Sequence, residues 1–291
     1  MYILKHSVSK SYLLVTIVVA SIFVSLAFAG NVLAITNGQP DAGRHPYVGL
    51  AIFDAPDENG NVVPTWRCSC SLLSPTVVLT AGHCTDGAVA ARVWVSDRVY
   101  SFRETPPGQY PFTGSDSYEG TPYTYSSFAI GAGKGLPGFA TGDVGIIVLS
   151  EPVPTEVVSE YVSLPSENLV NTLKSKSPLD FVGYGVQYQI PGGGINPYNR
   201  WTGLKMRMYS FGELVSGQFI ISDSFIKMTA NPGGGSGGTC FVDSGGPILL
   251  RDTNTVLAVN SFGTNVNCKG VSYAFRVDTP DVLAWIDTFM P

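Results

Sequence analysis

Short apolar runs separated by turn-forming residues occupy most of the chain. Each run is bounded by Gly, Pro, Asp or Asn, as is typical of β-strands joined by turns. The strands expected from this pattern are residues 46–53, 66–73, 76–81, 90–95, 99–102, 143–149, 179–185, 247–250 and 255–262. The last two are close enough in sequence to form a hairpin. The pattern therefore predicts an all-β protein.

One long segment lacks this pattern. Residues 104–142 are rich in Gly, Pro, Tyr and Ser and show little periodicity, so we expect a long loop on the surface. After the next strand, the sequence Glu-Pro-Val-Pro at 151–154 interrupts the alternation. We place a domain boundary there, with one domain at 35–155 and a second at 156–291.

The end of the chain changes from a strand period to a helix period. Thr279 suits a helix N-cap, Pro280 the first helical position and Asp281 the positive end of the helix dipole. The apolar residues that would share one face are Val282, Leu283, Ile286 and Phe289. A helix over 279–290 is predicted.

The N-terminus reads as a secretory signal peptide. Lys5 and Lys10 precede an apolar run over 12–29, and small residues follow it. Cleavage after Ala34 would remove residues 1–34, whereas cleavage after Ala29 would leave a propeptide of residues 30–34. An uncleaved membrane anchor is the alternative, because the run is long enough to span a bilayer. We favour cleavage and expect a secreted, extracellular protein without a membrane attachment.

Composition narrows the function. The chain of 291 residues is 44% hydrophobic and 13% charged, which argues against disorder, and its 33 Gly and 20 Pro fit a turn-rich protein. A net charge of −5 and the lack of a Lys/Arg cluster argue against a nucleic-acid partner. After residue 34 the only histidines are His45 and His83, and no His/Cys group has zinc-site spacing. We expect no metal and no cofactor.

Candidate chemistry lies in the loop 238–247, Gly-Thr-Cys-Phe-Val-Asp-Ser-Gly-Gly-Pro. Its glycines allow sharp turns that can fix a serine hydroxyl and nearby N–H groups in direction. A serine nucleophile needs a base and preorganised donors for the oxyanion. A loop of this composition on its own is most often only a turn.

Two further blocks change that interpretation. Residues 80–84, Thr-Ala-Gly-His-Cys, and 143–149, Asp-Val-Gly-Ile-Ile-Val-Leu, precede the serine loop. Together the three blocks resemble the active-site blocks of the trypsin/chymotrypsin-like serine proteases, in that family's order of His, Asp and Ser. The resemblance covers the chain from about residue 35 to its end.

The resemblance implies two packed six-stranded antiparallel β-barrels with a C-terminal helix. It assigns Ser244 as nucleophile, His83 as general base and Asp143 as the group that orients His83. The backbone N–H groups of Val242 and Ser244 would form the oxyanion hole. The implied activity is that of a serine endopeptidase acting on polypeptides, and we expect a monomer whose partners can include a protein inhibitor. The segment 104–142 would then have a second interpretation, as a wall of the substrate cleft.

The resemblance also suggests how the five cysteines pair. Cys68–Cys84 matches the bridge beside the histidine, and Cys240–Cys268 the bridge beside the specificity pocket. Cys70 is left over, and we expect a buried free cysteine on a strand. A reactive thiol, an intermolecular bridge and a Cys70–Cys84 pairing remain alternatives.

Substrate preference is read from the positions that match the family's pocket. These positions are Gly238, Thr239, Ser261, Phe262, Gly263 and Gly270. Trypsin-like enzymes carry Asp where this chain has Gly238, so cleavage after Arg or Lys is not expected. An uncharged pocket suits an apolar or aromatic P1 side chain. Lys269 keeps an acidic P1 side chain open as an alternative.

One departure from the family concerns Val242, where the family has glycine. If that position needs an unusual backbone conformation, a β-branched residue resists it. The alternative function is therefore a catalytically weak homologue that serves as a binding module.

Activation is the last property that the resemblance implies. In the family a freed N-terminal Ile ammonium pairs with the Asp before the nucleophile, which would be Ile35 and Asp243 here. No Lys or Arg precedes Ile35, so cleavage after Ala34 would create the active terminus directly.

Overall fold

A computed structural model describes residues 35–101, 112–113, 117–131, 140–190, 200–202, 206–218, 220, 223–231 and 236–291. The predicted signal peptide and the alternative cleavage site after Ala29 lie outside the described residues, and so does part of the predicted loop 104–142.

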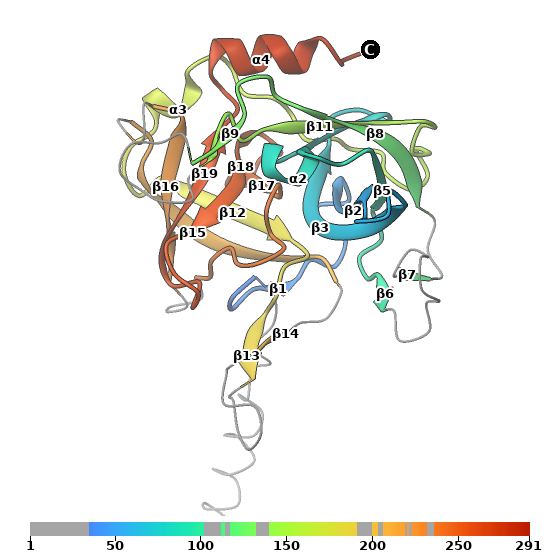
Figure 1. The fold of residues 1–291 in the computed structure, drawn as a ribbon. Helices are drawn as coiled ribbons and strands as arrows, with labels where there is room; N and C mark the ends of the chain where they lie inside the picture. The colour runs from blue at the N-terminus through green and yellow to red at the C-terminus, as the bar shows by residue number, and fades with distance from the viewer. Residues whose placement is uncertain are drawn as a thin grey trace, which may run out of the picture. The chain divides into compact units, whose positions relative to one another are not determined.

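The first half of the chain closes into a six-stranded antiparallel barrel with strand order β11-β4-β3-β2-β5-β8 (Figure 1). Its strands are β2 (Val48–Pro56), β3 (Val62–Leu72), β4 (Val77–Thr80), β5 (Ala90–Trp94), β8 (Tyr118–Thr124) and β11 (Gly145–Leu149). Strand β2 is buried along all but its last residue, because both of its faces are covered. Closure of the barrel leaves none of these strands with an unpaired edge.

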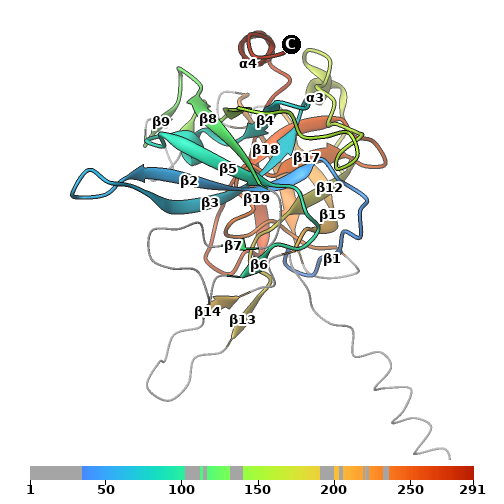
Figure 2. The ribbon, with the colours of Figure 1, turned by 90° about the vertical axis from the view of Figure 1, so that its right-hand side faces the viewer.

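The second half forms another closed barrel. Strands β15-β12-β17-β18-β19-β16 follow one another in the sheet, and a β15–β16 pairing closes the ring. Figure 1 labels all of these strands, and Figure 2 shows β12, β15, β17, β18 and β19 from a second direction. Their bounds are β12 (Pro178–Gly183), β15 (Met208–Ser216), β16 (Phe225–Ala230), β17 (Pro247–Leu250), β18 (Val256–Gly263) and β19 (Gly270–Arg276). Two six-stranded antiparallel barrels confirm the fold class that the resemblance implies.

Short strands and helices complete the described structure. The strands are β1 (Gln39–Pro40), β6 (Tyr100–Ser101), β7 (Phe112–Thr113), β9 (Ala129–Ile130), β10 (Ala140–Thr141), β13 (Tyr188–Ile190) and β14 (Arg200–Thr202). The helices are α2 (Gly82–Thr85), α3 (Leu169–Thr172) and α4 (Pro280–Asp287). The predicted hairpin of 247–250 and 255–262 corresponds to the paired strands β17 and β18.

The prediction of one long loop over 104–142 is wrong in part. Strand β8 lies inside that segment and pairs with both β5 and β11 to close the first barrel. Gly120 shows why its composition concealed it: a Cβ there would lie 2.7 Å from the side chain of Ile147, so the strand needs a glycine. Exposed and more buried positions alternate along β8, and most of the exposed positions carry polar residues. The strand therefore contains no apolar run.

The start of the described chain is held by the second barrel. The backbones of Thr36 and Gly238 form an antiparallel bridge, and β1 then pairs with β15. The side chain of Ile35 is only 1% exposed and belongs to the apolar core of that barrel. Ile35 is thus buried in the core of the second barrel.

Helix α4 packs its apolar face inward, with Val282 and Ile286 buried. Thr279 occupies the N-cap position as predicted, although its side chain makes no capping hydrogen bond. The ring of Trp285 lies 5.1 Å from that of Tyr125, whose hydroxyl donates a 3.0 Å hydrogen bond to Asp281. No helix in the described part of the chain is long and apolar enough to cross a membrane.

A buried arginine joins the two barrels. The guanidinium of Arg207 donates to Asp41 at 2.9 Å and to the carbonyls of Val48 and Val95, each at 2.9 Å. Arg207 precedes a strand of the second barrel, whereas Val48 begins a strand of the first. Asp97 is a second carboxylate partner of the same guanidinium, so Arg207 is held by two acids as well as by the two carbonyls.

Candidate active site

The loop that carries Ser244 has a conformation that depends on glycine. Gly245 has φ +77°, and a Cβ at that position would lie 2.1 Å from the hydroxyl of Thr80. Its N–H donates to the carbonyl of Asn260 at 2.8 Å, which ties the loop to β18. A larger residue at 245 would therefore displace the segment that holds Ser244.

Antiparallel pairing brings His83 and Asp143 together. Strands β4 and β11 pair with Thr80 opposite Gly145. His83 follows Thr80 by one tight turn into α2, and Asp143 stands two residues before Gly145. Both residues therefore lie at the same end of the strand pair, although their sequence blocks are far apart in the chain.

His83 and Asp143 form a close pair. The backbone N–H of His83 donates to Asp143 Oδ1 at 2.8 Å, and its ring Nδ1 lies 3.0 Å from Oδ1 and 2.9 Å from Oδ2. The side chain of Asp143 is fully buried and that of His83 is 29% exposed. The hydroxyl of Ser261 also donates to Asp143 Oδ2. The carboxylate is thus fixed from three directions and holds the imidazole by Nδ1.

The pair shifts both pKa values toward the charged forms. Burial would lower the pKa of His83, but the charge of Asp143 and its hydrogen bond raise it above the ordinary value. Burial would raise the pKa of Asp143, but the charge and hydrogen bonds of His83, together with the hydroxyl of Ser261, lower it. Asp143 is therefore ionised at neutral pH and stabilises a protonated His83.

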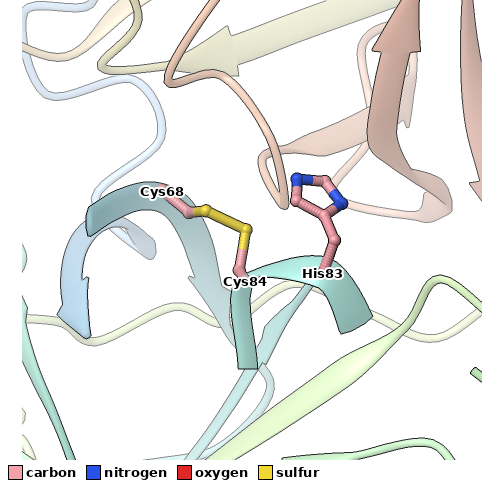
Figure 3. Close-up of side chains that lie close together, drawn as sticks. All are labelled: Cys68, His83 and Cys84. Carbon is pink, nitrogen blue, oxygen red and sulfur yellow. A yellow bond between two sulfur atoms is a disulfide. The ribbon is translucent and has the colours of Figure 1, made fainter. Parts of the chain in front are cut away.

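Ser244 and His83 are related through two neighbouring residues of β3. The N–H of Ser69 donates to the carbonyl of Ser244 at 2.9 Å, while Cys68 is bonded to Cys84, next to His83. Figure 3 shows this disulfide joining β3 to the short helix that carries His83. Among the described residues no hydrogen bond joins the hydroxyl of Ser244 to His83. Such bonds are often long in enzymes without substrate.

Val242 has the backbone conformation that a glycine would suit. Its φ is +75°, a left-handed value that costs a β-branched residue free energy. Its carbonyl accepts hydrogen bonds from the N–H and the hydroxyl of Ser69, at 3.1 and 3.0 Å. Within the described chain no acceptor takes the N–H of Val242 or of Ser244.

Asp243 is buried next to Ser244 in the sequence. Its carboxylate accepts the N–H of Gly185 at 2.8 Å and that of Cys240 at 2.9 Å. A Cβ on Gly185 would lie 2.2 Å from Asp243 Oδ2, so the carboxylate fits only against a glycine. Burial raises the pKa of Asp243 to about 7, because these two N–H donors compensate only part of the lost hydration.

A cavity of about 420 Å³ opens beside Ser244. Its walls are uncharged and consist of residues 239–241, 260–266, Ser244 and Cys268. Of the predicted pocket residues, Thr239, Ser261, Phe262 and Gly263 line it, whereas Gly238 and Gly270 are not among the lining residues. A Cβ on Gly238 would lie 2.7 Å from the backbone of Ala230, which leaves no room there for an aspartate.

A smaller cavity of about 190 Å³ adjoins His83 and Asp143. It is lined by His83, Ile130, Ala140, Asp143, Ser261 and Phe262. Ser261 and Phe262 line both cavities. Both cavities therefore lie along β18.

Both predicted disulfides are confirmed. Cys68 pairs with Cys84 and Cys240 with Cys268, while Cys70 is free and buried. The alternative pairing of Cys70 with Cys84 is thus contradicted. Cys68, Cys84 and His83 are the one described group with metal-ligand spacing, but a disulfide lacks the thiolate charge that metal binding requires.

Two roles were not visible in the sequence. Ser261 was predicted only as a pocket residue, but its hydroxyl also holds Asp143, 118 positions away. Ser69 was not singled out, although it bonds to both Val242 and Ser244. A small polar residue directly after a disulfide cysteine was the only available signal.

The family is shown by comparison with known proteins. A family model described as Trypsin matches residues 37–286. Serine protease 1 of Drosophila melanogaster is 28% identical over 256 residues, which cover 87% of this chain and 84% of that protein. Brachyurin of Leptuca pugilator is 29% identical over 223 residues, which cover 76% of this chain and 86% of that protein.

Solved structures show the same fold. HL collagenase superposes with a TM-score of 0.61 at 22% identity, covering 86% of this chain and 96% of that chain. Human heparin binding protein superposes with a TM-score of 0.52 at 15% identity, covering 86% of this chain and 94% of that chain. The family model spans nearly all of both barrels, and the chain therefore belongs to the trypsin family and is a serine endopeptidase.

Proposed function

We propose that Ser244, His83 and Asp143 form the catalytic triad of this endopeptidase. The observation that carries the proposal is the buried Asp143 carboxylate that holds His83 by Nδ1. This bond leaves Nε2 as the nitrogen that takes the proton of Ser244 when the hydroxyl attacks a peptide carbonyl. His83 then returns that proton to the leaving amine, and water hydrolyses the acyl-enzyme by the same steps.

The N–H groups of Val242 and Ser244 are the proposed oxyanion donors. Neither donates to another group in the described chain. The N–H of Val242 shares its peptide group with the carbonyl of Phe241, which accepts the N–H of Val186 at 2.9 Å, and this bond fixes that peptide's orientation. Donors held in place before the reaction stabilise developing charge without reorganisation. Valine keeps the N–H that this role requires, so its cost is strain rather than a missing donor.

The proposed P1 residue is uncharged and bulky. The cavity beside Ser244 has uncharged walls and about 420 Å³ of space, and the side chains of Phe241 and Val266 at its lining are 49% and 68% exposed. Apolar or aromatic side chains would cover this exposed surface. Lys269 is not among the lining residues, which favours an apolar P1 over an acidic one.

Activation and export complete the proposal. A chain that begins at Ile35 would carry an ammonium group next to the segment that the Thr36–Gly238 bridge holds. Asp243, buried and without a cation in the described chain, is the group that this ammonium would neutralise. The apolar N-terminal segment and the two disulfides fit secretion, with polypeptide substrates and a protein inhibitor outside the cell.

Intact mass spectrometry tests these roles together. The secreted protein would be treated with a serine-directed fluorophosphonate, with Ser244→Ala as the control. We expect one adduct on a chain that begins at Ile35, and no adduct on the variant. An unlabelled chain that begins at Ile35 would contradict an activated Ser244, and active protein that begins at Gly30 would contradict direct activation.

A further inference from the structure

Arg67 is a charged residue of the site region that no role described so far explains. It stands on β3 immediately before Cys68 and pairs with Ile52 on β2. Through the Cys68–Cys84 disulfide its strand is fastened to the helix of His83 (Figure 3). Arg67 is therefore one residue from the covalent link that positions the catalytic base.

The guanidinium of Arg67 has no partner in the part of the chain that the structure describes. Five other arginines pair with an acid or lie over an aromatic ring: Arg44 over Tyr209, Arg92 with Glu119, Arg207 with Asp41, Arg251 with Asp180 and Arg276 with Asp278. No hydrogen bond, ion pair or ring contact links the side chain of Arg67 to any described residue.

Arg67 is also partly buried. Its exposure is intermediate, and this loss of hydration lowers the pKa of the guanidinium, with no nearby acid to oppose the shift. A surface arginine normally keeps its head in water and buries only its stem. A partly desolvated, unpaired guanidinium gains more than an exposed one from a carboxylate that reaches it.

The strand directs Arg67 toward the oxyanion loop. Successive side chains of a strand point to opposite faces. The side chain of Cys68 meets Cys84, so Arg67 and Ser69 share the other face of β3, where the regular register with β2 continues. The hydroxyl of Ser69 on that face donates to the carbonyl of Val242.

Arg67 is not among the residues that line the two cavities. Both cavities are lined by Ser261 and Phe262 of β18, in the second barrel. In the proposed function the acyl part of a substrate lies along these cavities. The leaving-group part must then pass over the face of β3 that carries Ser69 and Arg67.

We propose that Arg67 binds a substrate carboxylate on the leaving-group side of the scissile bond. This inference rests on the proposed function of Ser244 and its cavity. Ser69, which contacts the oxyanion loop, and Arg67 are two positions apart on β3, or about 7 Å along the strand. An extended substrate advances about 3.4 Å per residue, so the carboxylate belongs to one of the first three residues after the scissile bond. It is either an acidic side chain or the C-terminal carboxylate of a short leaving peptide, and a fork of N–H donors suits both.

The test uses matched internally quenched peptides that share one apolar P1 residue. In one arm each pair of peptides differs by Glu or Gln at one of the three positions after the scissile bond. In the other arm each pair ends at one of those positions, with a free carboxylate in one peptide and an amide in the other. The readout is the ratio of kcat/KM within each pair, measured for the wild type and for Arg67→Gln, Arg67→Lys and Arg92→Gln. Arg92 also pairs with Ile52, from the other side of β2, but has Glu119 as its acid, so it is the matched control.

We expect the wild type and Arg92→Gln to prefer the carboxylate about tenfold at one position, and Arg67→Gln to lose that preference. Arg67→Lys should keep part of it, and added salt should weaken it. The arm that shows the preference identifies the source of the carboxylate. The inference is wrong if the active wild type cleaves the carboxylate and the neutral peptide of every pair equally well, or if Arg67→Gln keeps the wild-type ratio. Either result leaves the proposed function standing. A wild type that cleaves no peptide overturns the proposed function and this inference with it.

Discussion

The backbones of Thr36 and Gly238 exchange two hydrogen bonds, of 3.0 and 3.2 Å. Gly238 begins the loop that ends with Ser244, and Thr36 follows the residue expected to become the N-terminus. The segment that follows the expected cleavage site is thus seated in the second barrel, one residue from Ile35. Cleavage after Ala34 would place a positive charge on Ile35, directly beside this bridge.

The first prediction concerns Asp243. In protein that begins at Ile35 we expect Asp243→Asn to lower kcat/KM by at least about 100-fold, because the buried ammonium would lose its counter-charge. The control is the exposed Asp287, whose change to Asn should have little effect. Peptide hydrolysis by both variants measures the difference, and near-normal activity of Asp243→Asn would contradict the activation pair.

Asp243 also predicts how stability depends on pH before cleavage. Its folded pKa of about 7 lies above the ordinary pKa of 3.8, so between these values the folded state holds the proton more tightly. The unfolding free energy of Ser244→Ala protein that retains residues before Ile35 should therefore fall as pH rises from about 4 to 7. Denaturant unfolding measures this slope, which should weaken or reverse in protein that begins at Ile35.

The triad predicts a large effect of Asp143→Asn. The amide would present an N–H toward Nδ1 and favour the wrong imidazole tautomer, so kcat should fall by about 10⁴-fold. Asp86→Asn, an exposed change next to the helix of His83, is the control. A loss of less than tenfold for Asp143→Asn would remove Asp143 from the triad.

The pKa of His83 sets the acidic limb of the pH profile. Only neutral imidazole can accept the proton of Ser244, and Asp143 raises the pKa of His83 above the ordinary value of 6.5. The value of kcat/KM should thus be lost as pH falls through a midpoint above 6.5, and a profile from pH 4 to 9 measures it. A midpoint well below 6.5 would show that Asp143 does not act on His83 as proposed.

Sequence reasoning succeeded where function depends on local blocks. The residues around His83, Asp143 and Ser244 identify the family, and from it follow both barrels and both disulfides. It failed where a role depends on pairing across the chain. The bond from Ser69 to Val242 joins residues 173 positions apart, and the turn-rich composition of β8 conceals a barrel strand. Neither can be read from a window of neighbouring residues.

Val242 yields a prediction about strain. At φ +75° glycine is favoured over valine by about 1–3 kcal/mol, so Val242→Gly should retain activity or increase it. Val242→Ala should lie between the two. Active-site titration and kcat/KM measure the effect per active enzyme. A loss of more than about tenfold in Val242→Gly would refute the strain argument and indicate that the side chain itself serves the reaction.

Gly263 yields a prediction about the P1 cavity. A Cβ there meets only the carbonyl of Asn265, at 4.0 Å, so the fold has room for a side chain that points into the cavity mouth. Gly263→Val should reduce kcat/KM for Phe or Leu at P1 by about 100-fold and affect Ala at P1 much less. A peptide series that differs only at P1 measures this, and a uniform loss would place the P1 side chain elsewhere.

The buried thiol of Cys70 can report when the first barrel opens. The thiol is fully buried in the first barrel, and burial raises its pKa above the ordinary range, so folded protein presents no reactive thiolate. The other four cysteines are held in disulfides. Modification by a thiol reagent can then occur only in molecules whose first barrel has opened. The rate of that modification counts opening events in the unaltered enzyme, at any pH or with any inhibitor bound.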